Sequence, residues 1–237
     1  MGVPMSQHPD PLDRLEEERR RAGGRVTFRQ QLDRCDRMLV EAGTRLATTI
    51  QPVTTAFLEA DAHAATDATR VDEEIREACR ELEESSHVLL AREAPVAGDL
   101  RRVVAVLRSV PDVERSSNLL RHVAESLTWI HPPSMPDELR RIIDDLGRVS
   151  AEIFAGAVEA WRVHDGLAAN DLATRDDQVD LLQKCLLTEL YTGRQSVEEA
   201  VSLALIARYY ERIADHGVEM ARLIAYAVTG QRPPDDT

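Results

Sequence analysis

The sequence predicts an all-α protein built as two tandem three-helix bundles, six long helices related as an internal repeat. Hydrophobic residues make up 43% of the 237 residues, but aromatic residues only 4%. Runs of β-branched residues are short, which disfavours a large sheet. Apolar residues recur with helical periodicity along most of the chain and are interrupted at a few Pro, Gly and Ser clusters. Long helices joined by short breaks follow from this pattern.

Six helices are expected, and local signals mark their ends. The predicted ranges are 27–60, 62–93, 95–130, 135–168, 170–194 and 196–229. Pro95 fits the first turn of the third helix, where a missing N–H is tolerated. The cluster His131–Pro136 breaks the chain near its middle. Ser196 and Glu199 form a capping box that opens the sixth helix, and Gly230 closes that helix.

Pro111 falls inside the third predicted helix. It removes a backbone donor, and its ring clashes with the carbonyl of Leu107, so the sequence predicts a kink or break at this point.

The two halves of the chain align with each other. A shift of 97 residues places Val113–Asn118 over Tyr210–Asp215, and a slightly larger shift places Asp72–Arg76 over Asp176–Asp180. A three-helix unit repeated twice explains both alignments.

The alignment divides the chain into three segments. The first repeat is predicted over residues 27–132 and the second over residues 133–237. Residues 1–26 are rich in Pro, Gly and charged residues and poor in apolar ones, so they are predicted to form a mobile N-terminal tail.

The composition excludes several classes of protein. A net charge of −13 repels phosphate backbones and anionic lipids, so nucleic acid is not an expected partner. No stretch approaches the roughly 18 apolar residues of a membrane span, and no apolar signal-peptide segment is present. The cysteines are Cys35, Cys79 and Cys185, and they form no C-x-x-C motif. We therefore expect a cytoplasmic protein without direct membrane insertion.

Two pairs of carboxylates suggest a metal site in the second repeat. Glu211 and Asp215 lie four residues apart on the sixth helix, and Asp176 and Asp180 have the same spacing on the fifth. Such residues are neighbours on a helix surface, so two acids repel each other unless a cation lies between them. Oxygen ligands suit Fe, Mn or Mg, with Zn a further candidate. His216 is a weaker ligand candidate. The alternative to a metal site is that these acids form a solvated face and pair with surface arginines.

The first repeat lacks half of this ligand set. Arg76 and Asn118 stand where the second repeat has the second acid of each pair. A guanidinium at this position can bridge Asp72 and Glu114 and so replace a cation. We therefore expect no tightly bound metal in the first repeat, where Asp72, Glu114 and also Asp112 remain weaker candidates.

The sixth helix has one apolar stripe that is predicted to face the core. The stripe consists of Ala200, Leu203, Ala207, Ala214, Val218, Ala221 and Ala225. Leu205 and Tyr209 lie on another side of this helix and are expected to pack on a neighbouring helix or on a partner.

No catalytic residue is predicted. The sequence has no nucleophile with a base, phosphate-binding Gly loop or cofactor fingerprint. A carboxylate di-metal enzyme in a helical bundle usually needs two Glu-x-x-His motifs, and the only one found is Glu84-Ser-Ser-His87. These residues predict a protein that is not an enzyme; a metal-free helical scaffold or adaptor and a di-metal helical-bundle enzyme are the alternatives kept open.

Several segments resemble one known family. Pro95–Arg101 and Ala207–His216 closely resemble the signatures of the PhoU family of phosphate-uptake regulators, and Asp176–Asp180 and Val228–Gly230 fit the same pattern. Gly217–Arg222 looks most like the actinobacterial branch of this family.

The resemblance implies a fold and a role. It implies two tandem three-helix bundles in a cytoplasmic negative regulator of phosphate uptake and phosphate-starvation signalling. Its implied partners are the ATPase or permease of a phosphate ABC transporter and a sensor histidine kinase, with a homodimer left open. It also implies that the Glu/Asp-x-x-x-Asp motifs bind metal.

Overall fold

Six α-helices and one short 3-10 helix account for the fold. The computed structural model describes residues 11–128 and 135–231, and it contains no strand within these residues. The elements are α1 (Pro11–Glu59), α2 (Ala62–Glu93), α3 (Ala97–Glu125), η1 (Ser126–Thr128), α4 (Asp137–Val163), α5 (Ala168–Thr192) and α6 (Val197–Thr229). The predicted six-helix, all-α fold is confirmed.

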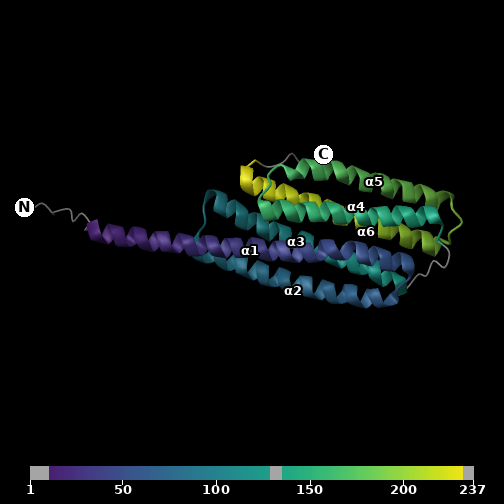
Figure 1. The fold of residues 1–237 in the computed structure, drawn as a ribbon, viewed down its shortest axis with the longest axis horizontal. Helices are drawn as coiled ribbons and strands as arrows, with labels where there is room; N and C mark the ends of the chain where they lie inside the picture. Colours follow the sequence, from purple (N-terminus) through teal and green to yellow (C-terminus); the bar gives the residue numbers. More distant parts are fainter. Residues whose placement is uncertain (1–10, 129–134, 232–237) are drawn as a thin grey trace, which may run out of the picture.

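The helices form two bundles that lie side by side (Figure 1). Helices α1, α2 and α3 pack on one another, as do α4, α5 and α6, and the two bundles meet where α3 packs on α6 and α1 packs on α4. One hydrophobic core runs through both bundles and includes Leu39, Val106, Trp161 and Tyr210. The internal repeat predicted from the sequence is therefore present as two matching three-helix units.

Helix α1 starts earlier than the sequence predicts. It begins at Pro11 rather than near residue 27, and its N-terminal part extends past the other helices (Figure 1). The segment Glu16–Arg21 consists of glutamate and arginine, which both favour helix even where no apolar face exists. Residues 1–10 of the tail expected over 1–26 lie outside the described residues, and the mobility of that tail stays a prediction.

Helix α3 differs from its prediction in two details. Its N-cap is Val96, so Pro95 lies just before the helix rather than in its first turn. The helix continues without interruption through Pro111, and the expected break does not form. Val110 and Val113, on either side of this proline, are almost fully buried, and this packing offsets the loss of one backbone hydrogen bond.

Helix α6 is central to the second bundle because it contacts α3, α4 and α5. The predicted capping box is confirmed: Ser196 N donates to Glu199 Oε2 over 2.8 Å, and Glu199 N donates to Ser196 Oγ over 3.2 Å. Gly230 ends the helix with a φ of 74°, a left-handed conformation that glycine adopts without strain. The predicted core stripe is buried apart from Ala200, which is half-buried. Leu205 is half-exposed, and Tyr209 packs partly against the core.

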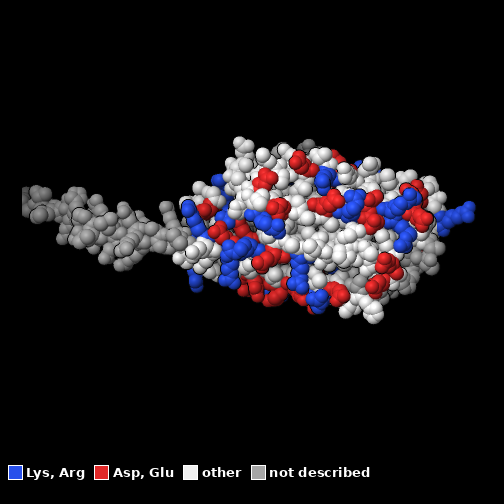
Figure 2. All heavy atoms as spheres, viewed as in Figure 1, with Lys and Arg blue, Asp and Glu red and all other residues white. Residues whose placement is uncertain are grey.

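Charge is mixed over the surface that Figure 2 shows. Asp and Glu side chains alternate with Arg over both bundles on this face, and no extended basic area is visible there. None of the helices in the described ranges carries an apolar stretch long enough to cross a bilayer.

Candidate metal centre

The fold brings the four predicted carboxylates of the second repeat into one electrostatic cluster. Asp176 and Asp180 come from α5, and Glu211 and Asp215 come from the adjacent α6. Partial burial, followed by the charges of Asp215, Asp180 and Glu211, raises the pKa of Asp176 from an ordinary value of 3.8 to about 7. Four acids therefore act on one another between two packed helices, as the spacing predicted. We call these four residues the second-repeat acidic cluster.

Two carboxylate oxygens of this cluster are buried without a hydrogen-bond partner. Glu211 is only 8% exposed, and one of its oxygens pairs with Arg208. Its other oxygen, Oε2, is buried and has no hydrogen-bond donor among the described residues, and the same holds for Oδ1 of Asp176. A buried carboxylate oxygen without a partner is costly, so both atoms favour the approach of a positive group.

The remaining electrostatics of the cluster point in the same direction. Burial and then Asp215 raise the pKa of Glu211, against the opposing effect of Arg208. Burial of its carboxyl group also raises the pKa of Asp215, against the opposing charges of Arg208 and His216. Among the described residues Asp180 pairs with Lys184, at 3.8 Å in an exposed pair that contributes little. Arg208 and Arg212 oppose the raised pKa values of Glu211 and Asp215 but do not reverse them.

The corresponding site of the first repeat is fully satisfied by protein groups. Asp72 is 2% exposed, and its Oδ1 accepts a hydrogen bond from Ser117 Oγ over 2.8 Å. Its Oδ2 lies 2.7 Å from Arg76 Nη2 and 3.2 Å from Arg121 Nε. Nε of Arg76 also lies 3.7 Å from Oε1 of Glu114. The predicted guanidinium bridge between Asp72 and Glu114 is therefore confirmed.

The repeat alignment shows why the two sites differ. Each of the three donors to Asp72 is replaced in the second repeat by a group that cannot donate to a carboxylate. Arg76 becomes Asp180, Ser117 becomes Ala214 and Arg121 becomes Val218. The carboxylate at the Asp72 position is kept as Asp176, so it faces new negative charge with fewer protein partners. This exchange is the strongest structural argument for a cation in the second repeat.

The weaker candidates do not join the second-repeat acidic cluster. Nδ1 of His216 lies 3.0 Å from Oδ1 of Asp112, so these two residues pair with each other between α6 and α3. Both side chains are largely buried, with 12% and 11% exposed, and Nε2 of His216 has no partner. Asp72 and Glu114 are bridged by Arg76 as described above.

The positions of the side chains are not those of an assembled coordination sphere. Among the described residues, no three His, Cys, Asp or Glu groups converge closely enough to hold a metal ion as they stand. The donor types and the orphaned oxygens fit a hard or borderline cation. Coordination by all four acids would require their side chains to rotate toward a common point.

Sequence reasoning missed one polar cluster and located another surface only in part. Asp36, 5% exposed on α1, accepts a hydrogen bond from Arg102 Nε on α3 over 2.7 Å and lies 2.9 Å from Nε2 of His164 after α4. Two of the three residues come from separate helices and the third follows a further helix, and they carry no local motif. Leu205 and Tyr209, expected to face a neighbour or partner, line a groove against the end of α3.

The di-metal enzyme alternative finds no support at its one motif. Glu84 and His87 are both exposed on α2, whereas a di-metal oxidase needs these groups directed into the bundle core.

Fold and site together define a class: an all-α tandem-repeat protein with a cluster of acids between two helices of one repeat. The PhoU domain family matches residues 39–127 and 143–224, one match in each repeat. The chain therefore belongs to the PhoU family.

Individual relatives agree with this assignment. The phosphate-specific transport system accessory protein PhoU homolog 1 of Mycobacterium leprae is 35% identical over 216 residues, which cover 90% of this chain and 97% of that protein. PhoU homolog 2 of Mycobacterium tuberculosis is 35% identical over 212 residues, covering 88% of this chain and 100% of that protein. The crystal structure of PhoU from Pseudomonas aeruginosa aligns with a TM-score of 0.79 at 24% identity, covering 86% of this chain and 100% of that chain.

Proposed function

We propose that this protein is a cytoplasmic, non-enzymatic negative regulator of phosphate uptake and phosphate-starvation signalling. In this role it links a phosphate ABC transporter to a sensor histidine kinase. The observation that carries the proposal is family membership over both repeats, with mycobacterial relatives that are named accessory proteins of phosphate-specific transport systems. Long helical faces suit a protein that acts by binding partners.

We further propose that the second-repeat acidic cluster holds a metal ion, with Fe, Mn, Mg and Zn as the candidates. Asp176, Asp180, Glu211 and Asp215 would be its ligands. The supporting observations are the two buried oxygens without donors and the replacement of Arg76, the counterpart of Asp180, by an acid. Such a cation would supply the positive charge that Arg76 supplies in the first repeat. By binding acids from both helices, it would hold α5 and α6 together.

Complementation tests the regulatory role. A bacterial host that lacks its own PhoU-family protein would receive this chain together with a reporter from a phosphate-starvation promoter. In excess phosphate the reporter should be repressed, as in the unmodified host. A reporter that stays active while the protein is stably expressed, and while PhoU from the host restores repression, would contradict the proposal.

A metal-free scaffold is the second candidate, because no three potential ligands converge as they stand. The two candidates differ in the same assay. If metal is needed, Asp180→Ala with Asp215→Ala should abolish repression, whereas Asp171→Ala, an exposed acid near the start of α5, should not. Full repression by the double variant, together with no metal in the purified protein, would favour the metal-free scaffold.

A further inference from the structure

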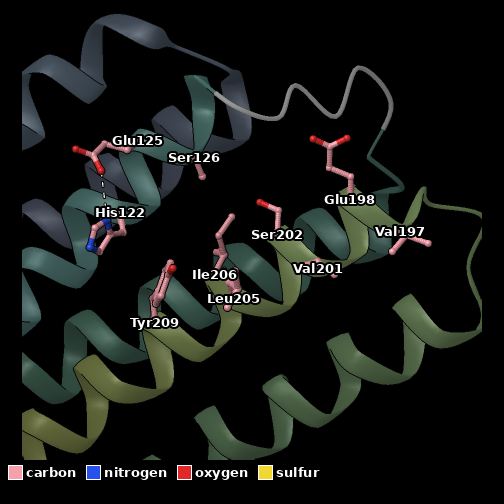
Figure 3. A pocket seen from close by; sticks show the side chains of 10 residues that line it. All are labelled: His122, Glu125, Ser126, Val197, Glu198, Val201, Ser202, Leu205, Ile206 and Tyr209. Carbon is pink, nitrogen blue, oxygen red and sulfur yellow. Dashed lines mark hydrogen bonds and ion pairs between the residues drawn. The ribbon is translucent and has the colours of Figure 1, made fainter.

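A groove of about 740 Å³ lies between the end of α3 and the first half of α6 (Figure 3). Helix α6 lines it with Val197, Val201, Leu205 and Tyr209, which follow one another at intervals of four residues. Residues with this spacing form a line along one side of a helix. The first three are exposed to 82%, 55% and 48%, so a continuous apolar line faces solvent.

The length of the groove suits a short helix. The span from Val197 to Tyr209 rises about 18 Å at 1.5 Å per residue, which is roughly three helical turns. A short amphipathic helix buries an apolar residue once or twice per turn when it lies in such a groove. Three turns of the line on α6 therefore match about three turns of a bound helix.

The rim of the groove is acidic. Glu198 lines it from α6 and has no cationic partner among the residues that the structure describes. On the opposite side Glu125 lies beside His122, 3.2 Å from its Nδ1, as Figure 3 shows. Glu125 also pairs with Arg121, which does not line the groove, so Glu198 carries the unbalanced negative charge of the rim. No Arg or Lys is among the described residues that line the groove. An apolar floor with an acidic rim, on a chain of net charge −13, favours an occupant that carries basic residues.

The first repeat shows that the fold does not require this apolar line. The repeat alignment places Leu205 over Arg108 and His122 over Glu219. Arg108 Nη2 and Glu219 Oε1 lie 3.1 Å apart, so an ion pair spans α3 and α6 at the equivalent place. Leu100 and Val104, the counterparts of Val197 and Val201, are also apolar. The two repeats therefore differ at Leu205, where the first repeat has an arginine that is closed by an ion pair.

We propose that the groove between α3 and α6 binds a short amphipathic helix of a partner protein, with large apolar residues on one face and Lys or Arg on its flanks. This inference deepens the proposed function, on which it rests for the biological identity of the partner, by naming the kind of segment that the regulator binds. Binding itself requires only the groove. The second-repeat acidic cluster takes no part in it.

The test uses the full chain and defined peptides. The probe is a fluorescein-labelled 14-residue helix of leucine and lysine with all leucines on one face, and binding is followed by fluorescence anisotropy at physiological salt. Two matched peptides accompany it: one has glutamate in place of lysine, and the other has the same composition in an order that spreads the leucines around the helix. The amphipathic lysine peptide should bind, and the other two should bind at least about tenfold more weakly.

Variants locate the binding site. Leu205→Arg and Val201→Lys should each weaken binding of the amphipathic lysine peptide about tenfold or more. Leu187→Arg is the matched control, because Leu187 on α5 is exposed to 45%, close to the 48% of Leu205. It should leave binding within about twofold. The peptide assay measures neither metal content nor reporter repression, so a failure of the proposed function and a failure of the groove proposal give different results.

Four outcomes would overturn the inference. Equal binding of the scrambled peptide would show that the apolar face is not recognised, and equal binding of the glutamate peptide would show that the basic flanks are not recognised. Unchanged binding by both groove variants, with thermal unfolding like that of the wild type, would place the peptide elsewhere. A wild-type dimer that becomes monomeric in Leu205→Arg, as measured by light scattering, would make a second copy of this chain the occupant.

Discussion

Nη2 of Arg76 lies 2.7 Å from Oδ2 of Asp72, at the position where the second repeat carries Asp180 beside Asp176. The first repeat thus neutralises its buried aspartate with a fixed guanidinium. The second repeat places another acid there and leaves Oδ1 of Asp176 without a donor. The two repeats therefore differ in the charge beside their equivalent aspartates, and the proposed cation of the second repeat rests on this difference.

Replacing residues of the first repeat with their second-repeat counterparts should make the stability of the first repeat depend on a bound cation. In the double variant Arg76→Asp with Asn118→Asp, Asp72 keeps only Ser117 and Arg121 as partners and faces two new acids. The free energy of unfolding without metal should fall by about 1–3 kcal/mol, and Mn²⁺ should restore part of it. Urea unfolding with and without Mn²⁺ measures both effects.

The single variant Arg115→Asp is the control for this charge change, because Arg115 is an exposed arginine on the same helix α3 as Asn118. If the double variant loses no more stability than Arg115→Asp, then Arg76 does not hold the first-repeat site together.

The metal-free protein should lose stability as the pH rises. The pKa of Asp176 is about 7 in the folded protein and ordinarily 3.8. Below pH 3.8 the carboxyl group of Asp176 is protonated in both the folded and the unfolded protein, so it does not change the free energy of unfolding. Between 3.8 and 7 the unfolded chain releases its proton while the folded chain retains it, so stability falls across this window and is level above it. Because Asp176 is only half-buried, the effect is on the order of 1 kcal/mol.

Chemical unfolding at pH 5 and pH 8 in the presence of a chelator measures this slope. Asp176→Asn should flatten it, and so should saturation with metal. A slope of the opposite sign, or one that Asp176→Asn leaves unchanged, would remove the electrostatic basis of the site.

The contact between the two bundles should tolerate no added methyl group at Gly147. A Cβ at this position would lie 2.2 Å from Oγ1 of Thr54, whose hydroxyl group also lies 2.7 Å from the buried Tyr210 hydroxyl. Gly147→Ala should therefore destabilise the protein by about 1–3 kcal/mol through overpacking. Gly98→Ala, where the nearest atom is 3.8 Å away, should be neutral or slightly stabilising in thermal unfolding. Equal melting temperatures for the two variants would mean that α1 and α4 are packed less closely than described.

The pair of Asp112 and His216 should contribute more to stability than the nearby ion pair of Arg108 and Glu219. Asp112→Ala leaves a largely buried imidazole without its partner and should cost about 1–3 kcal/mol. The side chains of Arg108 and Glu219 are exposed to 50% and 39%, so Arg108→Ala should cost at most about 1 kcal/mol. Urea unfolding of both variants measures the two losses of stability. A larger loss in Arg108→Ala than in Asp112→Ala would contradict the prediction.

Local patterns explain how much of the fold could be predicted. Helix periodicity, the capping box at Ser196 and the glycine at 230 are all readable within a few residues, and they locate α6 closely. The predicted start of α1 was wrong. The sequence around Glu16–Arg21 has helix propensity but no apolar face, and the prediction relied on an apolar face. Of the kink or break predicted at Pro111, the break does not form, because the burial of neighbouring valines is a tertiary effect.

The same distinction applies to the site. Acids four residues apart on one helix, and the arginine that replaces one of them, are local features, so the cluster and the Arg76 bridge could be predicted. Asp112 and His216 are 104 residues apart, and each alone is an ordinary polar residue. Their pairing depends on how α3 crosses α6, which a single sequence does not specify. The groove also depends on that crossing, although Leu205 could be assigned to the side of α6 away from the core.

Metal content tests the central claim most directly. Plasma mass spectrometry would be applied to protein purified without a metal-affinity column, as wild type, as Asp180→Ala with Asp215→Ala, and as Asp72→Ala with Glu114→Ala. Stoichiometric metal in the wild type and in the first-repeat variant, and its loss in the second-repeat variant alone, is the predicted result. Folded protein without metal in all three samples would contradict the account.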